Sequence, residues 1–278
     1  MKGVAIHSTL QMIPVLSHIR IYPVKSLDPV ELPQAEIGSY SLRYDREFAM
    51  LTNDNQLING KRTGRVSELK AEYEIEKHLI TLGPRTGGSR KTFHLLNGRK
   101  ELETYLTKFF EMPVSIAHNV DGQLMDMPVS SGVTMVSEES LQSLQHDMPS
   151  YSLDNLRLRF RANLEIRGVD AYWEEQLFGM PGMGVGFLIG DVTMIGISPR
   201  GRCNVPPRDP LTGVTDKTFI KAMMKSRAAS LPSESKLLRH GNLYQLTVNT
   251  YIPEIEKGKM IKVGDEVRIT GPVDLNEG

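Results

Sequence analysis

The chain of 278 residues contains a single cysteine, Cys203. One thiol cannot form an internal disulfide, and it cannot supply the several thiolates of a zinc finger or an iron–sulfur cluster. Basic and acidic residues number 33 each, so the formal net charge is zero and no overall field attracts nucleic acid. We therefore expect no nucleic-acid partner, and any polyanion has to be bound by a local group of cations.

Long apolar runs are also missing from the sequence. No stretch reaches the roughly 20 apolar residues that cross a bilayer, and residues 1–10 lack the apolar run of a signal peptide. These features predict no membrane partner and a cytoplasmic location. The first strand-like pattern opens at Met12, so we expect residues 1–11 to be a loose tail or an upstream start.

Several enzyme signatures are not found. The seven histidines show no HxH or HExxH spacing for zinc or non-haem iron, and no GxSxG element marks an α/β-hydrolase nucleophile. The glycines of residues 179–186 match neither a phosphate loop nor a dinucleotide fingerprint, and we expect a mobile loop there.

Alternating apolar and polar residues predict a mainly β fold of the α+β class. From Val15 to Tyr22, Ile19 and Ile21 share one face, which is the pattern of a half-buried strand. Further strands are predicted at residues 47–52, 71–75, 79–82, 114–117, 159–166, 187–197, 243–251 and 260–269. Helices are predicted at residues 100–110, after a cap at Ser137, and at about 218–229. Short strands at this spacing are typical of an antiparallel barrel or sandwich.

Cys203 follows a predicted strand and has arginines on its N-terminal side, at Arg200 and Arg202. Nearby cations favour a thiolate, which is both a nucleophile and a soft metal ligand. The alternative is a small buried apolar residue. The prolines at 206 and 207 argue against a core strand, and the residues alone leave the two interpretations balanced.

Three further clusters carry donors suited to phosphate and to the edge of a heterocycle. Each cluster alone is also typical of a solvated strand end. They are Tyr22-Pro23-Val24-Lys25-Ser26, Tyr44-Asp45-Arg46, and Arg159-Phe160-Arg161-Ala162-Asn163.

These clusters, in this order along most of the chain, resemble one known family. Other matching segments are Val136-Ser137-Glu138-Glu139-Ser140-Leu141, Ile189-Gly190-Asp191, Arg202-Cys203, Asp209-Pro210-Leu211-Thr212-Gly213 and Ile261-Lys262-Val263-Gly264-Asp265-Glu266-Val267. The sequence is similar to MOSC proteins with an N-terminal MOSC β-barrel domain, the group that includes the mitochondrial amidoxime-reducing component and its bacterial relatives.

The resemblance implies a barrel-like N-terminal domain over residues 12–118 and a MOSC β-barrel domain over residues 120–273, separated within the Asp-, Gly- and Ser-rich segment 119–132. A molybdenum-molybdopterin cofactor would lie between them. The family also implies pyridoxal phosphate binding, described at the level of the domain.

The resemblance also assigns roles to residues of the site. Cys203 takes the role of catalytic residue and molybdenum ligand. The expected cofactor-binding residues are Lys25, Ser26 and Arg46 at the phosphate end, Arg161 and Asn163 at the pterin, Arg202 before the ligand, and Ser137. The sequence departs from the family pattern at Ala162, Pro206 and Pro207, which affects the substrate side of the pocket.

The first functional hypothesis is an oxidoreductase that reduces N-hydroxylated or related N-oxygenated small molecules. Because the chain has no cysteines for a fused [2Fe-2S] domain, electrons would come from a separate protein of the ferredoxin, flavodoxin or cytochrome-reductase type. A second hypothesis is a non-catalytic cofactor carrier or sulfur-handling module. A third is a structural pterin-binding protein without metal.

Overall fold

A computed structural model describes residues 13–121, 124, 132–231, 233 and 242–276. The tail of residues 1–11, the opening of the first strand at Met12 and most of the segment 119–132 lie outside these residues. Within the described part, no helix combines the length and the apolar character needed to span a membrane.

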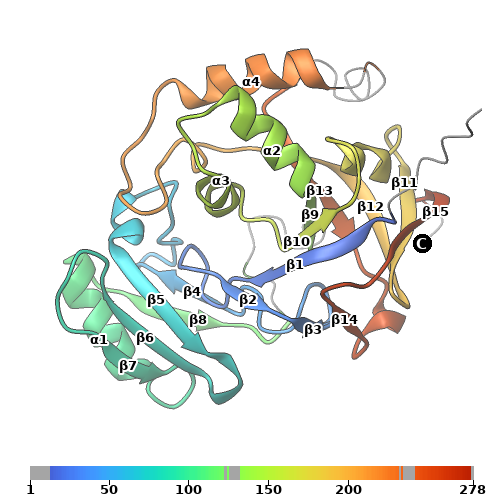
Figure 1. Cartoon of the computed structure of the whole chain (residues 1–278). Helices are drawn as coiled ribbons and strands as arrows, with labels where there is room; N and C mark the ends of the chain where they lie inside the picture. The colour runs from blue at the N-terminus through green and yellow to red at the C-terminus, as the bar shows by residue number, and fades with distance from the viewer. Residues whose placement is uncertain (1–12, 122–123, 125–131, 232, 234–241, 277–278) are drawn as a thin grey trace, which may run out of the picture.

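The largest unit is a sheet of eight strands (Figure 1). Its strands pair antiparallel except β9 and β10, which run parallel because two helices connect them. In spatial order the sheet contains β15 (Val267–Asp274), β11 (Met183–Ile189), β12 (Val192–Gly201), β13 (Gln245–Tyr251), β9 (Thr134–Ser137), β10 (Leu164–Arg167), β1 (Val15–Ile21) and β2 (Val30–Leu32).

The two ends of this sheet meet and close it into a barrel. The N–H of Leu16, in β1, donates to the carbonyl of Asp265 at 2.9 Å, and the N–H of Val267, in β15, donates to the carbonyl of Pro14 at 2.8 Å. The barrel interior holds an apolar cluster that includes Leu16, Ile19 and Ile21 of β1. The first strand of the chain therefore completes a barrel built mainly from its second half.

The remaining strands lie in three small sheets. β3 (Gln34–Glu36) pairs with β14 (Met260–Lys262), and β4 (Phe48–Leu51) pairs with β8 (Ser115–His118). The third sheet joins β5 (Leu69–Glu74), β6 (Leu79–Pro84) and β7 (Lys91–His94). Helix α1 (Arg99–Phe110) packs with β4 to β8 around a second apolar cluster. Short 3-10 helices are η1 (Gly64–Glu68), η2 (Ile75–Lys77), η3 (Trp173–Leu177) and η4 (Glu254–Glu256).

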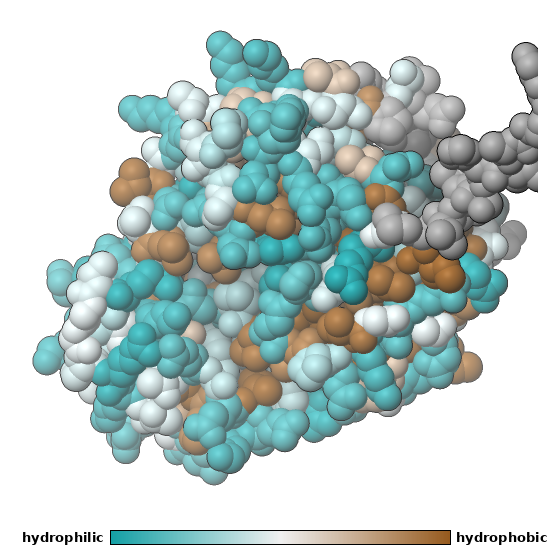
Figure 2. Space-filling view, in the orientation of Figure 1, coloured by the Kyte–Doolittle hydropathy of each residue, from teal (hydrophilic) through white to brown (hydrophobic). Residues whose placement is uncertain are grey.

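Three helices cover one side of the barrel in Figure 1: α2 (Glu138–Asp147), α3 (Leu153–Phe160) and α4 (Phe219–Ser230). A third apolar cluster lies between these helices. The face of the molecule in Figure 2 is mostly hydrophilic, with small groups of apolar residues. The α+β fold class and the predicted helices at 100–110, after Ser137 and at about 218–229 are confirmed.

The predicted strand 159–166 is wrong in its first part. Arg159 and Phe160 end helix α3, and Arg161 is its left-handed C-cap. The helix forms because the side chain of Ser152 caps the N–H of Asn155 at 3.1 Å, and because the apolar side chains of Leu156 and Phe160 are buried against α2 and α4. Only residues from Leu164 onward are extended.

Three other expectations need correction. Residues 187–197 form two strands, because Gly190 adopts a left-handed φ of 58° in the turn between β11 and β12. Residues 260–269 are likewise divided between β14 and β15 by a turn at Gly264. The expected mobile loop at 179–186 contains the start of β11. Gly184 fits there because an added Cβ would lie 2.8 Å from Ile195 and 2.9 Å from the carbonyl of Gly196.

Candidate functional site

A cavity of about 430 Å³ lies where the end of α3, the end of β12 and loops of the N-terminal region meet. Its lining contains nine lysine and arginine residues and one carboxylate, that of Asp28. The nine cations are Lys25, Arg46, Lys61, Arg85, Arg159, Arg161, Arg200, Arg202 and Arg208. Although the chain is neutral overall, this cavity is strongly cationic, and such a lining attracts a polyanion.

Six of the residues expected at the site line this cavity. They are Lys25, Ser26, Arg46, Arg161, Arg202 and Cys203, which come from four separate segments of the chain. Two others, Asn163 and Ser137, are not among the lining residues. Cys203 is exposed and carries a free thiol.

Three lining residues have a left-handed backbone. Ser26, Arg46 and Arg161 have φ values of 74°, 54° and 54°, in a region that non-glycine residues seldom adopt. Such conformations cost about 1 to 3 kcal/mol each and are concentrated at binding and catalytic sites. This clustering is typical of a functional cavity.

Tyr22 holds the two arginines of the site in place. Its ring is fully buried, with the guanidinium carbon of Arg161 3.9 Å and that of Arg46 4.7 Å from the ring centroid. The carboxylate of Asp45 accepts a hydrogen bond from the N–H of Tyr22 at 2.8 Å and also pairs with Arg46. Stacking on an aromatic face and pairing with a fixed carboxylate restrict both side chains.

Asn163 acts on the cavity through Arg46. Its Oδ1 accepts a hydrogen bond from Nη1 of Arg46 at 3.0 Å, and its Nδ2 donates to the carbonyl of Arg20 at 2.9 Å. The residue is 1% exposed. Because both ends of its amide are used within the protein, Asn163 orients Arg46 and does not itself face the cavity.

Ser137 lies apart from the other residues. Its hydroxyl caps α2 by accepting the N–H of Ser140 at 3.2 Å, and it donates to Oε2 of Glu174 at 2.7 Å. The residue is fully buried, and burial also raises the pKa of the Glu174 carboxyl that it contacts. The geometry gives Ser137 a role in the helix cap.

Arg202 precedes Cys203 and is half-buried. Its Nη2 donates to the carbonyl of Phe160 at 2.7 Å, whereas its Nε is buried and has no hydrogen-bond partner in the described part of the chain. Burial and the neighbouring Arg200 lower the pKa of Arg202 to about 10, and the charge of Cys203 acts in the opposite direction.

Arg161 has a similar environment. Burial lowers its pKa, and the nearby charge of Arg46 acts in the same direction. Its Nη2 donates to the carbonyl of Leu27 at 2.9 Å. Neither Arg161 nor Arg202 forms an ion pair with any carboxylate that the structure describes. Removing a cation partly from water without a counter-ion is unfavourable, so a bound anion would stabilise this half-buried pair.

Sequence reasoning did not find Lys61 and Arg85, which reach the cavity from the loop after β4 and from the residue after β6. Arg85 pairs with Asp28 at 2.8 Å and also donates to the carbonyl of Leu69 at 2.7 Å. Asn59-Gly60 before Lys61 is a common turn sequence, and nothing in this local pattern indicates that the turn lines the same cavity as Cys203.

A group of potential metal ligands lies elsewhere, although no histidine spacing predicted one. The ligand atoms of His18, Glu138 and Glu165 lie within 4.8 Å of one another. Glu165 is bonded to Arg157 at 2.6 Å and to Arg20 at 3.0 Å. Because two arginines already neutralise this carboxylate, the group is an ion-pair network.

Comparison with known proteins agrees with this architecture. The family model of the MOSC domain matches residues 121–268, and that of the MOSC N-terminal beta barrel domain matches residues 13–119. The chain therefore belongs to the MOSC domain family, with an N-terminal MOSC β-barrel domain.

Curated relatives match over most of the chain. Mitochondrial amidoxime reducing component 2 of Bos taurus is 25% identical over 93% of this chain and 84% of its own length. Molybdenum cofactor sulfurase of Homo sapiens is 20% identical over 77% of this chain and 28% of its own length. The YuaD protein of Bacillus subtilis has a solved structure with a TM-score of 0.40 and 11% identity, covering 93% of this chain and 97% of YuaD.

Proposed function

We propose that this protein binds a molybdenum-pterin cofactor in the cationic cavity, with Cys203 as the molybdenum ligand. It would use the cofactor to reduce small N-hydroxylated or related N-oxygenated compounds. The observation that carries the proposal is the pair of half-buried arginines without carboxylate partners among the described residues, Arg161 and Arg202, on a cavity that the exposed Cys203 also lines.

The chemistry of the lining fits such a cofactor. Molybdopterin carries a phosphate and two sulfur donors, so it is a polyanion that would offset the excess of arginine and lysine. The unpartnered Nε of Arg202 is a donor for which the protein itself provides no acceptor among the described residues. A thiolate at Cys203 supplies the soft ligand that a metal with sulfur donors favours.

Different residues would bind different parts of the cofactor. Lys25, Ser26 and Arg46 would hold the phosphate, with Arg46 oriented by Tyr22 and Asn163. Arg161 would contact the pterin from its fixed position against Tyr22. When bound, the cofactor would supply the oxygen-atom and electron chemistry, and the protein would orient it. Ser137 is left out of this proposed site because its hydroxyl is used by α2 and Glu174.

The substrate class and the electron donor belong to the same proposal. The name of the bovine relative, an amidoxime reducing component, supports N-oxygenated substrates. A chain with one cysteine cannot build an iron–sulfur relay of its own, which supports a separate donor of the ferredoxin, flavodoxin or cytochrome-reductase type. The division into domains at residues 12–118 and 120–273 is supported by the limits of the two family models.

Cofactor analysis tests the proposal directly. Protein produced in a host that makes the cofactor should contain molybdenum and pterin in near equal amounts, because the cavity offers one thiol. Arg46→Ala should retain less of both, since it removes a charge-assisted contact worth about 1.5 to 3 kcal/mol. Absence of metal and pterin from the wild-type protein would refute cofactor binding.

Cys203→Ala separates catalysis from binding. This variant should keep much of its pterin, which the arginines hold, and should lose reduction of benzamidoxime with a chemical or reconstituted electron donor. Equal turnover in both forms would contradict the ligand role of Cys203. A wild-type protein with a full molybdenum complement and no turnover would instead favour a cofactor carrier.

A further inference from the structure

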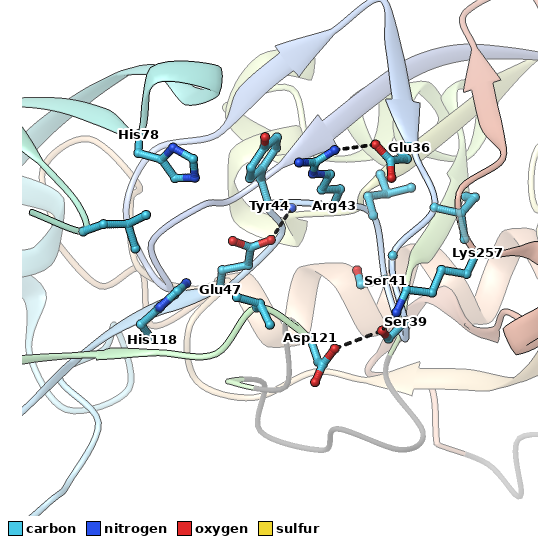
Figure 3. A pocket seen from close by; sticks show the side chains of 15 residues that line it. Glu36, Ser39, Ser41, Arg43, Tyr44, Glu47, His78, His118, Asp121 and Lys257 are labelled. Atoms are coloured by element: carbon cyan, nitrogen blue, oxygen red, sulfur yellow. Dashed lines mark hydrogen bonds and ion pairs between the residues drawn. The ribbon is translucent and has the colours of Figure 1, made fainter.

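A second cavity, of about 310 Å³, lies between β3, the segment before β4, η2 and the end of β8 (Figure 3). It shares none of its lining residues with the cationic cavity. The polar residues that line it are Glu36, Ser39, Ser41, Arg43, Tyr44, Glu47, His78, His118, Asp121 and Lys257.

In one half of this cavity the charged groups satisfy each other. Arg43 pairs with Glu36 at 2.6 Å. Nζ of Lys257 donates to Oγ of Ser39 at 2.8 Å, and Ser39 donates to Oδ1 of Asp121 at 2.9 Å. Figure 3 shows these groups on the side of the cavity nearest Lys257. Each of these charged side chains therefore already has a partner within the protein.

The other half contains Glu47, His78 and His118, and Glu47 lies between the two rings in Figure 3. Glu47 is 6% exposed, and its Oε1 accepts the N–H of Tyr44 at 2.8 Å. Among the described residues the carboxylate has no ion-pair partner within 4.0 Å. Burial raises its pKa, whereas the hydrogen bond from Tyr44 and the charge of Arg43 act in the opposite direction. A cation bound at Glu47 would relieve this unfavourable environment.

The neighbours of Glu47 suit a planar cation. The ring of His118 stacks on Phe48 at 4.4 Å, and burial lowers its pKa, so it is neutral at pH 7 and one ring nitrogen can accept a hydrogen bond. The guanidinium of Arg43 already lies 4.9 Å from the ring centroid of Tyr44, so the apolar surface of this half comes from Leu96 and Val120. The site therefore combines an anion, acceptors and apolar contacts.

A single metal ion fits this half poorly. In the described part of the chain, the one group of three ligands whose atoms lie within 4.8 Å of one another is that of His18, Glu138 and Glu165. Glu47 and the two histidines of the cavity are therefore too far apart to coordinate one ion together. A planar group with several N–H donors can bond to acceptors that do not converge on one point.

We propose that this second cavity binds a small organic cation bearing an amidinium or guanidinium group, with the Glu47 carboxylate as its counter-ion. The site selects cations because Arg43 pairs with Glu36 and Ser39 bridges Lys257 to Asp121, which leaves Glu47 without a contacting cation among the described residues. The nine cations of the first cavity repel such a molecule. The inference does not depend on the cofactor proposed above, because it rests on a separate set of residues.

Binding of benzamidine, measured by isothermal titration calorimetry, tests this inference. The wild-type protein should bind one equivalent, and Glu47→Gln should weaken binding about tenfold or more because it removes the counter-ion while it keeps an oxygen for the N–H of Tyr44. Glu76→Gln is the matched control, since Glu76 is exposed near His78 and does not line the cavity. This control should change affinity by less than about twofold.

Three further measurements serve as controls. Benzamide, the neutral isostere, should not bind, and Cys203→Ser should bind benzamidine as the wild type does. Thermal denaturation should show that Glu47→Gln is folded. Wild-type affinity in Glu47→Gln, equal binding of benzamide, or binding of Zn²⁺ without binding of benzamidine would each overturn the inference.

Discussion

Arg161 has two features that each oppose folding. Its backbone is left-handed, with φ at 54°, and its half-buried guanidinium has no carboxylate partner in the part of the chain that the structure describes. Helices commonly end with glycine at such a position, because glycine lacks the Cβ that makes this conformation costly. The contacts that the arginine side chain makes here are a hydrogen bond to the carbonyl of Leu27 and stacking on Tyr22, and the proposed function adds a bound anion.

Replacing Arg161 by glycine and by alanine separates these two costs. Both variants lose the guanidinium and should retain less cofactor, but Arg161→Gly should be more stable than Arg161→Ala by about 1 kcal/mol because only glycine adopts this φ freely. Urea denaturation of the cofactor-free proteins gives the difference in free energy of unfolding. Equal stability of the two variants would show that the left-handed backbone carries no cost.

The sequence predicted several of the side chains that line the cavity, but it did not predict which way each side chain points. Lys25, Arg46, Arg161 and Cys203 were predicted from the order of short motifs, and the fold brings them to one cavity. Asn163 stands in the same motif, yet the register of β10 beside β1 directs its amide to Arg46 and Arg20. Such orientation depends on partners more than 100 residues away in the sequence, which no local pattern contains.

The elements that were mispredicted have tertiary causes. Helix α3 has only eight residues, and its last apolar residue, Phe160, lies among arginines that also suit a strand end. Strand β11 begins with glycines that lack strand propensity. Gly184 and Gly186 are required because the neighbouring strand β12 and the segment 270–273 lie too close for a side chain. The low strand propensity of glycine favours a loop at these positions, but pairing with the neighbouring strands makes them part of β11.

Helix α4 is fixed to the rest of the molecule by a buried ion pair. Arg227 is fully buried, its Nη2 donates to Oε1 of Glu175 in η3 at 2.8 Å, and its Nε and Nη1 have no partner among the described residues. Its guanidinium also lies 4.6 Å from the ring centroid of Tyr172. Loss of the carboxylate would leave a buried and poorly satisfied cation.

Glu175→Gln should therefore lower the free energy of unfolding by about 3 kcal/mol, the usual effect of breaking one side of a buried pair. Urea denaturation followed by circular dichroism measures it. Glu74→Gln, which removes the exposed pair with Lys77, is the control and should change little. An equally small effect of both substitutions would mean that Arg227 finds another acceptor.

The whole molecule is tied together by the barrel. β1 and β2 come from the N-terminal region, yet they lie in the sheet that the second region forms, and their side chains enter its core. The N-terminal region also has a core of its own, around α1. The two regions matched by separate family models are therefore joined through β1, and we expect them to fold together.

A fragment of residues 120–278 should consequently not fold by itself, because it lacks the strand that lies between β10 and the start of β15. Its amide NMR spectrum should show little dispersion, and co-expression with residues 1–119 should restore a folded complex. A cooperative thermal transition in the isolated fragment would contradict this expectation and would mean that the barrel closes without β1.

The hydrogen bond between Leu16 and Asp265 also has a consequence for how the protein is made. During translation the segment of β1 leaves the ribosome long before the segment around Asp265 that closes the barrel against it. Until then β1 has an open edge and an apolar face, which are exposed to aggregation and to chaperones. The lining of the cavity beside Arg46 and Cys203 extends to Asn249, so the cavity is complete only after that residue has left the ribosome, and no ligand can be loaded there earlier.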